Sequence, residues 1–265
     1  MRARTVFLGT GLIVVLGAAA ALNGQQPAQA PAAPAAPAGP TILLAPGLRE
    51  VPDYRKNVGD PPAPAIPDGY TSIFNGKDLT GWHVSTTARH GVQPDFHVAH
   101  GMILGTQRPF GSGGLLLTDK KYKNVEVFLE IKPDWGCDGG LFLRSSEAGE
   151  AYQVMLDYLP GGNMGGVYGE RLQGVTAAAA RTWEQAWKRE EWNTVRARIE
   201  GDVPHIQVWI NGEQVTDFTD TANHAKDGAL DGMLAIQMHY SNETTKRWVP
   251  GGFWRWRTIA VKALP

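Results

Sequence analysis

Residues 139–157 alternate between apolar and polar positions with the period of two that is typical of β-strands. The apolar positions of the two predicted strands are Leu141, Leu143, Val154 and Leu156. Because successive side chains of a strand point to opposite faces, these four should pack into a core while Arg144, Gln153 and Asp157 share the other face. We therefore take this polar row as the candidate binding surface.

The same period of two recurs at short intervals between residues 68 and 264. In residues 125–131, apolar positions alternate with Glu126 and Glu130, which predicts a strand with a solvated, charged outer side. The other predicted strands cover residues 96–98, 102–104, 114–118, 194–200, 206–210, 233–240 and 253–264. Asn211 and Gly212 form the strongest hairpin turn. Many antiparallel strands with little helix predict an all-β, two-sheet antiparallel β-sandwich of the jelly-roll type.

Residues 176–190 are the only segment of this region with a helical pattern, so we expect one short helix here. Trp183 and Trp187 lie one turn apart and would share a helical face. Two interpretations of this face stay open. The rings either cover the domain or form a wall on which a sugar stacks.

The N-terminus has the order of an export signal. Arg2 and Arg4 precede an apolar run over residues 6–22, and Ala28-Gln29-Ala30 provides the small-residue pattern of a cleavage site. We therefore expect a signal peptide over residues 1–30, a Pro/Ala-rich linker over 31–67 and a folded domain over 68–265, in a periplasmic or secreted protein. The alternative is an uncleaved membrane anchor, and only then would a membrane be a partner.

The composition narrows the functional classes. The 265 residues are 43% hydrophobic, which is enough for one sizeable core. A net charge of -1 gives no general attraction for polyanions, so we expect no nucleic-acid partner. The single Cys137 excludes an intramolecular disulfide and a multi-cysteine metal site. Serine-hydrolase elbows, phosphate-binding loops, dinucleotide fingerprints and His-Glu-x-x-His motifs are absent from the sequence, which argues against those enzyme classes.

Residues 74–82, residues 116–132 with 139–145, and residues 191–218 resemble the 3-keto-disaccharide hydrolase domain family, in order and at plausible spacing. This family was long known as a domain of unknown function and is similar in fold to concanavalin A-like lectins and glucanases. The resemblance extends over about residues 68–264 and implies the same sandwich. The chain departs from the family at Asp138-Gly139-Gly140, where an Asn-Ser-Gly run is common, and at Gln153, where a Glu is common.

The resemblance implies cleavage of a glycoside whose sugar has been oxidised to a ketone at C3. Such a ketone acidifies the C2 hydrogen, so a base can form an enolate that expels the C1 substituent, and water then adds to the enone. This route needs a general base and a group that stabilises the enolate oxygen. Our candidates are Asp157 and His239 for the base and the acid, and Arg144 for the clamp. His239 is included because it shares the polar side of its strand with Gln237.

Further polar and aromatic residues complete the candidate surface. The substrate-binding candidates are Gln153, Gln237, Tyr168, Glu170, Asp138, Trp183 and Trp187. The sequence requires no cofactor, although Asp138 and Asp157 together suggest a divalent cation as an option. The expected partner is a carbohydrate. Two other functions stay open, namely a non-catalytic, lectin-like carbohydrate-binding module and a cell-surface adhesion domain held out on the Pro/Ala-rich spacer.

Overall fold

The computed structural model describes residue 63 and residues 65–265, so the predicted signal peptide and most of the predicted linker lie outside the described residues. In the described part, no helix has the length and hydropathy needed to cross a membrane.

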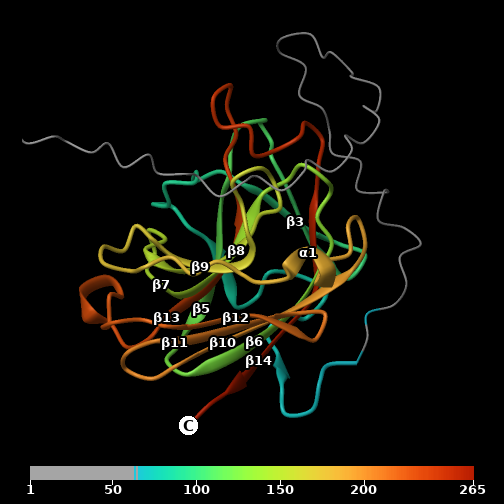
Figure 1. The fold of residues 1–265 in the computed structure, drawn as a ribbon. Coiled ribbons are helices and arrows are strands. Elements are labelled where there is room, and N and C mark those ends of the chain that lie inside the picture. Colours follow the sequence, from blue (N-terminus) through green and yellow to red (C-terminus); the bar gives the residue numbers. More distant parts are fainter. Residues whose placement is uncertain (1–62, 64) are drawn as a thin grey trace, which may run out of the picture. The chain divides into compact units, whose positions relative to one another are not determined.

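The described strands form two antiparallel sheets, which lie as two layers in Figure 1. The eight-stranded sheet has the spatial order β12 (Glu213–Thr219), β11 (His205–Ile210), β10 (Asn193–Glu200), β6 (Val125–Ile131), β14 (Trp254–Ala263), β4 (Met102–Thr106) and β3 (Asp95–Ala99), with β1 (Thr71–Ser72) paired to β14. The six-stranded sheet has the order β2 (Trp82–Val84), β5 (Gly114–Tyr122), β13 (Gly232–Met238), β7 (Gly139–Ser145), β8 (Ala151–Leu156) and β9 (Met164–Glu170). This two-sheet architecture confirms the predicted all-β sandwich.

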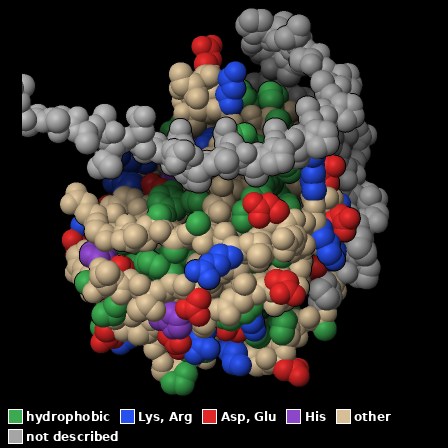
Figure 2. Space-filling model, in the orientation of Figure 1, with side chains coloured by type: hydrophobic (Ala, Val, Ile, Leu, Met, Phe, Trp, Pro, Cys, Tyr) green, Lys and Arg blue, Asp and Glu red, His purple; other side chains and the backbone are tan. Residues whose placement is uncertain are grey.

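The main core is built from side chains of both sheets. Leu129 and Val208 of the larger sheet belong to the same buried cluster as Leu141 and Val154 of the smaller one. All four apolar residues predicted for β7 and β8 are at most 1% exposed, as their strand parity requires. The opposite face of the smaller sheet carries Gln153 and Gln237 beside a second buried apolar cluster, which includes Leu115, Leu117 and Phe142. On the face shown in Figure 2, acidic and basic side chains are interspersed, in keeping with the net charge of -1.

The predicted hairpin at Asn211 and Gly212 is confirmed as the connection between β11 and β12. Both residues have positive φ, at 50° and 92°, which is the requirement of the tight turn that matches strand twist. The Asn211 side chain also receives a hydrogen bond from the Thr194 amide at 2.9 Å. The turn is therefore tied to the neighbouring strand β10.

The helix predicted over residues 176–190 is much shorter in the structure, where α1 (Trp183–Ala186) has four residues. Ala178 instead pairs with Val167 in an isolated β-bridge, so tertiary pairing overrides the helical preference of the alanine run. A three-residue 3₁₀ turn also occurs at Lys226–Gly228. Trp183 and Trp187 pack against the main core, which agrees with the interpretation that they cover the domain.

The outer side of β6 is not solvated, contrary to our prediction. Glu126 and Glu130 are only 8% and 4% exposed. Tyr70 donates a hydrogen bond to Glu126, and Arg257 Nη2 donates to Glu130 Oε1 at 2.6 Å. The neighbouring strand β14 and the segment before β1 thus supply hydrogen bonds that offset the free-energy cost of burying these carboxylates.

Candidate functional site

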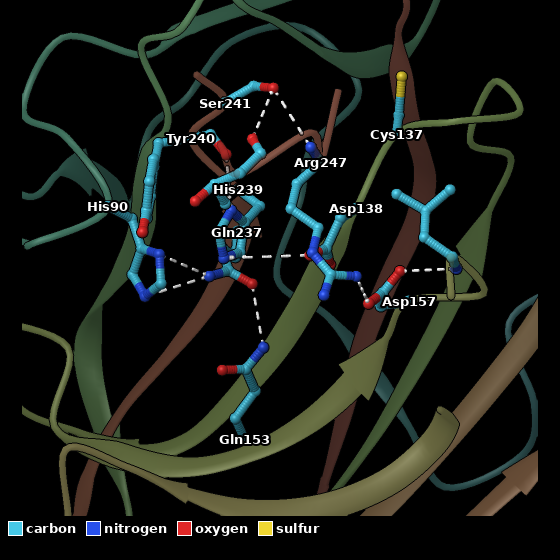
Figure 3. Close-up of polar contacts among 12 residues, drawn as sticks. His90, Cys137, Asp138, Gln153, Asp157, Gln237, His239, Tyr240, Ser241 and Arg247 are labelled. Carbon is cyan, nitrogen blue, oxygen red and sulfur yellow. Dashed lines mark hydrogen bonds and ion pairs between the residues drawn. The ribbon is translucent and has the colours of Figure 1, made fainter. Parts of the chain in front are cut away.

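A hollow of about 300 Å³ lies on the face of the six-stranded sheet that is turned away from the core. It is lined by Asp138, Gln153, Met155, Asp157, Gly161, Tyr168, Ala177, His239 and Arg247. The predicted residues Asp138, Gln153, Asp157, Tyr168 and His239 therefore lie around one space. Figure 3 shows most of these side chains and their contacts.

The backbone brings the charged residues of the hollow together. Asp138 precedes β7 and His239 follows β13, which is the neighbouring strand, and the His239 amide donates to the Asp138 carbonyl at 3.1 Å. Arg247 lies in the irregular segment between β13 and β14 and is held there because its carbonyl accepts from the Asp138 amide at 2.9 Å. Asp157 immediately follows β8. Strand ends and one long connection thus build the cluster.

The guanidinium of Arg247 lies beside two carboxyl groups in this cluster, those of Asp157 and Asp138. Arg247 Nη1 lies 2.7 Å from Asp157 Oδ2, as Figure 3 shows, and Arg247 Nε lies 4.0 Å from Asp138 Oδ2. Asp157 Oδ1 also accepts from the Leu159 amide at 2.8 Å. Asp157 is therefore the better stabilised anion of the two.

The electrostatics of the cluster favour retention of a proton. Burial, and then the negative charge of Asp157, raise the pKa of Asp138 to about 8, although Arg247 partly offsets this effect. Burial also raises the pKa of Asp157, against the opposing effects of the Leu159 amide and Arg247. When two buried carboxyl groups share one cation, ionisation of both costs free energy because the two negative charges repel each other. At neutral pH, the arrangement therefore supports one carboxylate, at Asp157, and one carboxylic acid, at Asp138.

His239 is a neutral imidazole at neutral pH. Its burial lowers the pKa to about 4, and the nearby His90 and Arg247 act in the same direction against a hydrogen bond to Tyr240. Nδ1 lies 2.7 Å from the Tyr240 carbonyl oxygen, which can only accept, so Nδ1 carries the proton. Nε2, 4.0 Å from Asp138 Oδ2, consequently presents a lone pair towards the hollow.

A chain of hydrogen bonds leads from the hollow to a neighbouring one of about 420 Å³ that shares His239. Gln153 Nε2 donates to Gln237 Oε1 at 3.0 Å, and Gln237 Nε2 lies 3.0 Å from His90 Nδ1 (Figure 3). His90 Nε2 lies 3.5 Å from Glu170 Oε1, and Tyr168 donates to the same carboxylate. The chain fixes the predicted residues Gln237, Tyr168 and Glu170 beside the site.

Gln153 Oε1 stands out at the end of this chain. The side chain is 3% exposed, and Oε1 has no hydrogen-bond partner among the described residues. An unmatched buried acceptor costs free energy, of the order of 1–3 kcal/mol. Since Gln153 lines the hollow, a hydroxyl group of a bound ligand would satisfy it.

The structure separates Arg144 from this site, so our prediction of a shared face is wrong for this residue. Its Nη2 donates to the Gly201 carbonyl at 2.7 Å and its Nε to the Lys123 carbonyl at 3.1 Å. The pairing of β7 with β13 shifts register here, and Arg144 has a φ of 51°. An extra residue in a bulged strand reverses the direction of the side chains, which accounts for the difference.

We expect Arg144→Ala to destabilise the protein by about 2 kcal/mol, because it removes charged hydrogen bonds to two carbonyls. The activity per folded molecule should stay unchanged. Denaturant unfolding and steady-state kinetics measure the two quantities. Arg198→Ala, which removes a more exposed ion pair with Glu200, is the control and should cost less than about 1 kcal/mol. Loss of turnover at unchanged stability would show that Arg144 takes part in the reaction and would contradict this prediction.

Arg247 and His90 are not among the site residues predicted from the sequence. Both lie outside regular strands, where the period of two gives no information about side-chain direction. Trp183 and Trp187 do not line the hollow. A divalent cation stays a prediction: Arg247 supplies positive charge beside Asp138 and Asp157, and the described residues contain no group of three or more His, Cys, Asp or Glu placed to hold a metal ion.

Solved structures with the same fold include carbohydrate-active proteins. A protein from Parabacteroides distasonis ATCC 8503, described as a candidate glycosyl hydrolase, superposes with a TM-score of 0.51 at 20% identity. The superposed region is 74% of this chain and 94% of the Parabacteroides chain. A GlcNAcα1-4Gal releasing endo-β-galactosidase from Clostridium perfringens gives a TM-score of 0.50 at 10% identity, over 76% of this chain and 64% of its own. At these identities the similarity establishes the fold alone.

Sequence comparison identifies the family of this chain. A curated protein from Bacteroides thetaiotaomicron, named 3-keto-disaccharide hydrolase, is 33% identical over 89 residues, which are 32% of this chain. The match spans only 30% of that relative's length. The family model described as "3-keto-alpha-glucoside-1,2-lyase-like domain" matches residues 69–262, which confirms the resemblance seen in the sequence. The chain therefore belongs to the 3-keto-α-glucoside-1,2-lyase-like domain family.

Proposed function

We propose that this domain cleaves 3-keto-α-glucosides by elimination across C1 and C2 followed by hydration, and that it does so outside the cytoplasm. The observation that carries the proposal is the meeting of Asp157, Arg247 and Asp138 in one hollow. The family description and the name of the Bacteroides relative support the substrate class. The export signal expected at residues 1–30 supports the location.

Asp157 is the general base and Arg247 the enolate clamp. The base must reach the hydrogen on C2 while a cation contacts the oxygen on C3, and these two carbons are bonded to each other. The 2.7 Å contact between Arg247 Nη1 and Asp157 Oδ2 places the two groups side by side, as this chemistry requires. The raised pKa of Asp157 makes it a stronger base than an ordinary carboxylate.

Asp138 is the general acid, in place of His239. With a pKa of about 8, Asp138 keeps its proton at neutral pH and can give it to the C1 oxygen as the alcohol leaves. The neutral His239 has its proton on Nδ1, bound to the Tyr240 carbonyl, and so has none on Nε2 to give. We assign His239 Nε2 and Gln153 Oε1 to hydrogen bonds from sugar hydroxyls.

The hydration step reverses these roles and balances the reaction. After the alcohol leaves, C1 and C2 share a double bond that is conjugated to the C3 ketone. Asp138, now a carboxylate, accepts a proton from water while the water oxygen bonds to C1. Asp157, now protonated, exchanges its proton with solvent while water replaces the departed alcohol, and then protonates C2. The sum is hydrolysis, with both side chains restored and no covalent intermediate on the protein.

The test compares methyl 3-keto-α-glucoside with its unoxidised parent in D₂O. We expect release of methanol from the keto sugar alone, with deuterium at C2 of the product. Free 3-ketoglucose incubated without protein corrects for spontaneous exchange. Cleavage of the unoxidised glucoside, or release without C2 deuterium beyond that background, would contradict the mechanism. Binding without turnover would identify a carbohydrate-binding module instead.

A further inference from the structure

A larger groove of about 720 Å³ is lined in part by the neighbours of Arg247 in the sequence. Its lining is rich in apolar side chains, which are Phe110, Leu159, Trp248, Val249 and Pro250. Glu243 and Lys246 are the charged residues of its lining. The groove therefore differs in character from the polar hollow that holds the two carboxylates.

Two of the apolar residues that line the groove have large exposed fractions. Phe110 is 52% exposed and Val249 is 39% exposed. They come from separate connections, between β4 and β5 and between β13 and β14, yet they line the same groove. Contiguous exposed apolar surface in a soluble domain commonly marks a binding site.

The groove borders the proposed active site, because residues within two positions of each other along the chain line the two spaces. Leu159 lines the groove, and its amide donates to Asp157 Oδ1 at 2.8 Å. Trp248 lines it directly after Arg247 in sequence. Gly136 lines it two residues before Asp138. Each segment that supplies a charged group to the hollow thus supplies a wall to the groove.

We propose that this groove is the aglycone subsite and that the preferred substrates are 3-keto-glucosides with an aromatic aglycone. The inference rests on the proposed function, because it assumes that a C1 substituent leaves from the hollow. A hollow of about 300 Å³ fits one sugar ring, whereas the groove of about 720 Å³ accepts a planar apolar group. Phe110 and Val249 flank that group, which removes their apolar surface from water.

The experiment compares benzyl and methyl 3-keto-α-glucosides, whose leaving alkoxides have nearly equal basicity, so that their kcat/KM ratio reports aglycone binding. Wild-type protein should prefer the benzyl substrate by at least about tenfold. Phe110→Ala should remove most of this preference and change kcat/KM for the methyl substrate less than about twofold. Equal effects on both substrates, or no effect on either, would overturn the proposal.

A second pair of variants tests whether the benzyl preference depends on the groove or on any exposed valine. Val249→Ser should also reduce the benzyl preference. Val203→Ser is its matched control, because Val203 is exposed to a similar extent, at 46%, on the turn between β10 and β11. The control should leave the benzyl preference intact. A loss in both valine variants would show that the preference does not depend on the groove.

A binding measurement separates failure of the subsite from failure of the proposed function. Benzyl alcohol alone, titrated into ¹⁵N-labelled protein, should shift the amide signals of Gly111, Gly136 and Val249. In Phe110→Ala these shifts should be lost. Shifts without turnover of any keto-glucoside would uphold an aromatic-binding groove and reject the enzyme, whereas turnover without shifts would reject the groove.

Discussion

We expect Asp157→Asn to lower kcat on 3-keto-α-glucosides by about 100- to 10,000-fold, which is the usual contribution of a general base. Asparagine keeps one oxygen, which can accept from the Leu159 amide, whereas its amide nitrogen replaces the oxygen that accepts from Arg247 Nη1, so the contact with Arg247 is lost. Asparagine cannot take the proton from C2. Because the sugar hydroxyls still meet Gln153 and His239, KM should change much less than kcat.

Steady-state kinetics with methyl 3-keto-α-glucoside measure this loss, and exchange of the C2 hydrogen in D₂O should disappear with it. Asp119→Asn is the matched control, since Asp119 is an exposed aspartate that pairs with His83 outside the hollow. It should behave as wild type. Asp157→Asn with nearly full kcat would mean that another group removes the proton.

The regular strands made much of this site predictable. Strand parity placed Leu141 and Val154 in the core and left Gln153 and Gln237 on the opposite face, where their side chains are hydrogen-bonded at 3.0 Å. The period of two is sufficient for such residues because each occupies a regular position of a strand. The same parity brought Asp157 and His239 to one hollow, although both lie just beyond the ends of their strands.

The errors arise where the backbone leaves that regularity. A single extra residue at Arg144 reverses side-chain direction, and nothing in one sequence marks a bulge at an arginine. Arg247 belongs to a connection without periodicity, so its position follows from backbone contacts with Asp138 that only the fold creates. The alanine run near Ala178 favours a helix locally, but pairing with β9 decides its conformation.

Asp138→Asn should make the protein more stable and less active. In the folded state, Asp138 keeps its proton up to a pH of about 8, whereas in the unfolded chain it loses the proton above about pH 4. Between these values the unfolded state binds fewer protons, so the free energy of unfolding falls as pH rises. Asparagine does not ionise and removes this loss. We expect a gain of about 1–2 kcal/mol near pH 7.

Thermal unfolding measured at several pH values tests the sign of this linkage. The melting temperature of Asp138→Asn should match that of wild type near about pH 4 and exceed it by roughly 2–6 °C near pH 8. A variant that is less stable than wild type at every pH would show that the ionised carboxylate is favoured in the fold. It would also remove the basis for a protonated Asp138.

The activity of Asp138→Asn tests the acid role separately from stability. Wild-type kcat/KM should fall above a pH of about 8, as Asp138 loses its proton, and the variant should lose this descending limb. With a methyl leaving group the variant should be at least about 100-fold slower than wild type. With 4-nitrophenoxide, which leaves without protonation, kcat/KM of the variant for nitrophenoxide release should approach that of wild type, because this parameter does not include the later hydration step in which Asp138 is the base. Asp157→Asn should stay slow by the same measure. Equal impairment of this kcat/KM with both leaving groups would assign Asp138 to positioning, because in the elimination step only a proton donor becomes dispensable when the departing oxygen needs no proton.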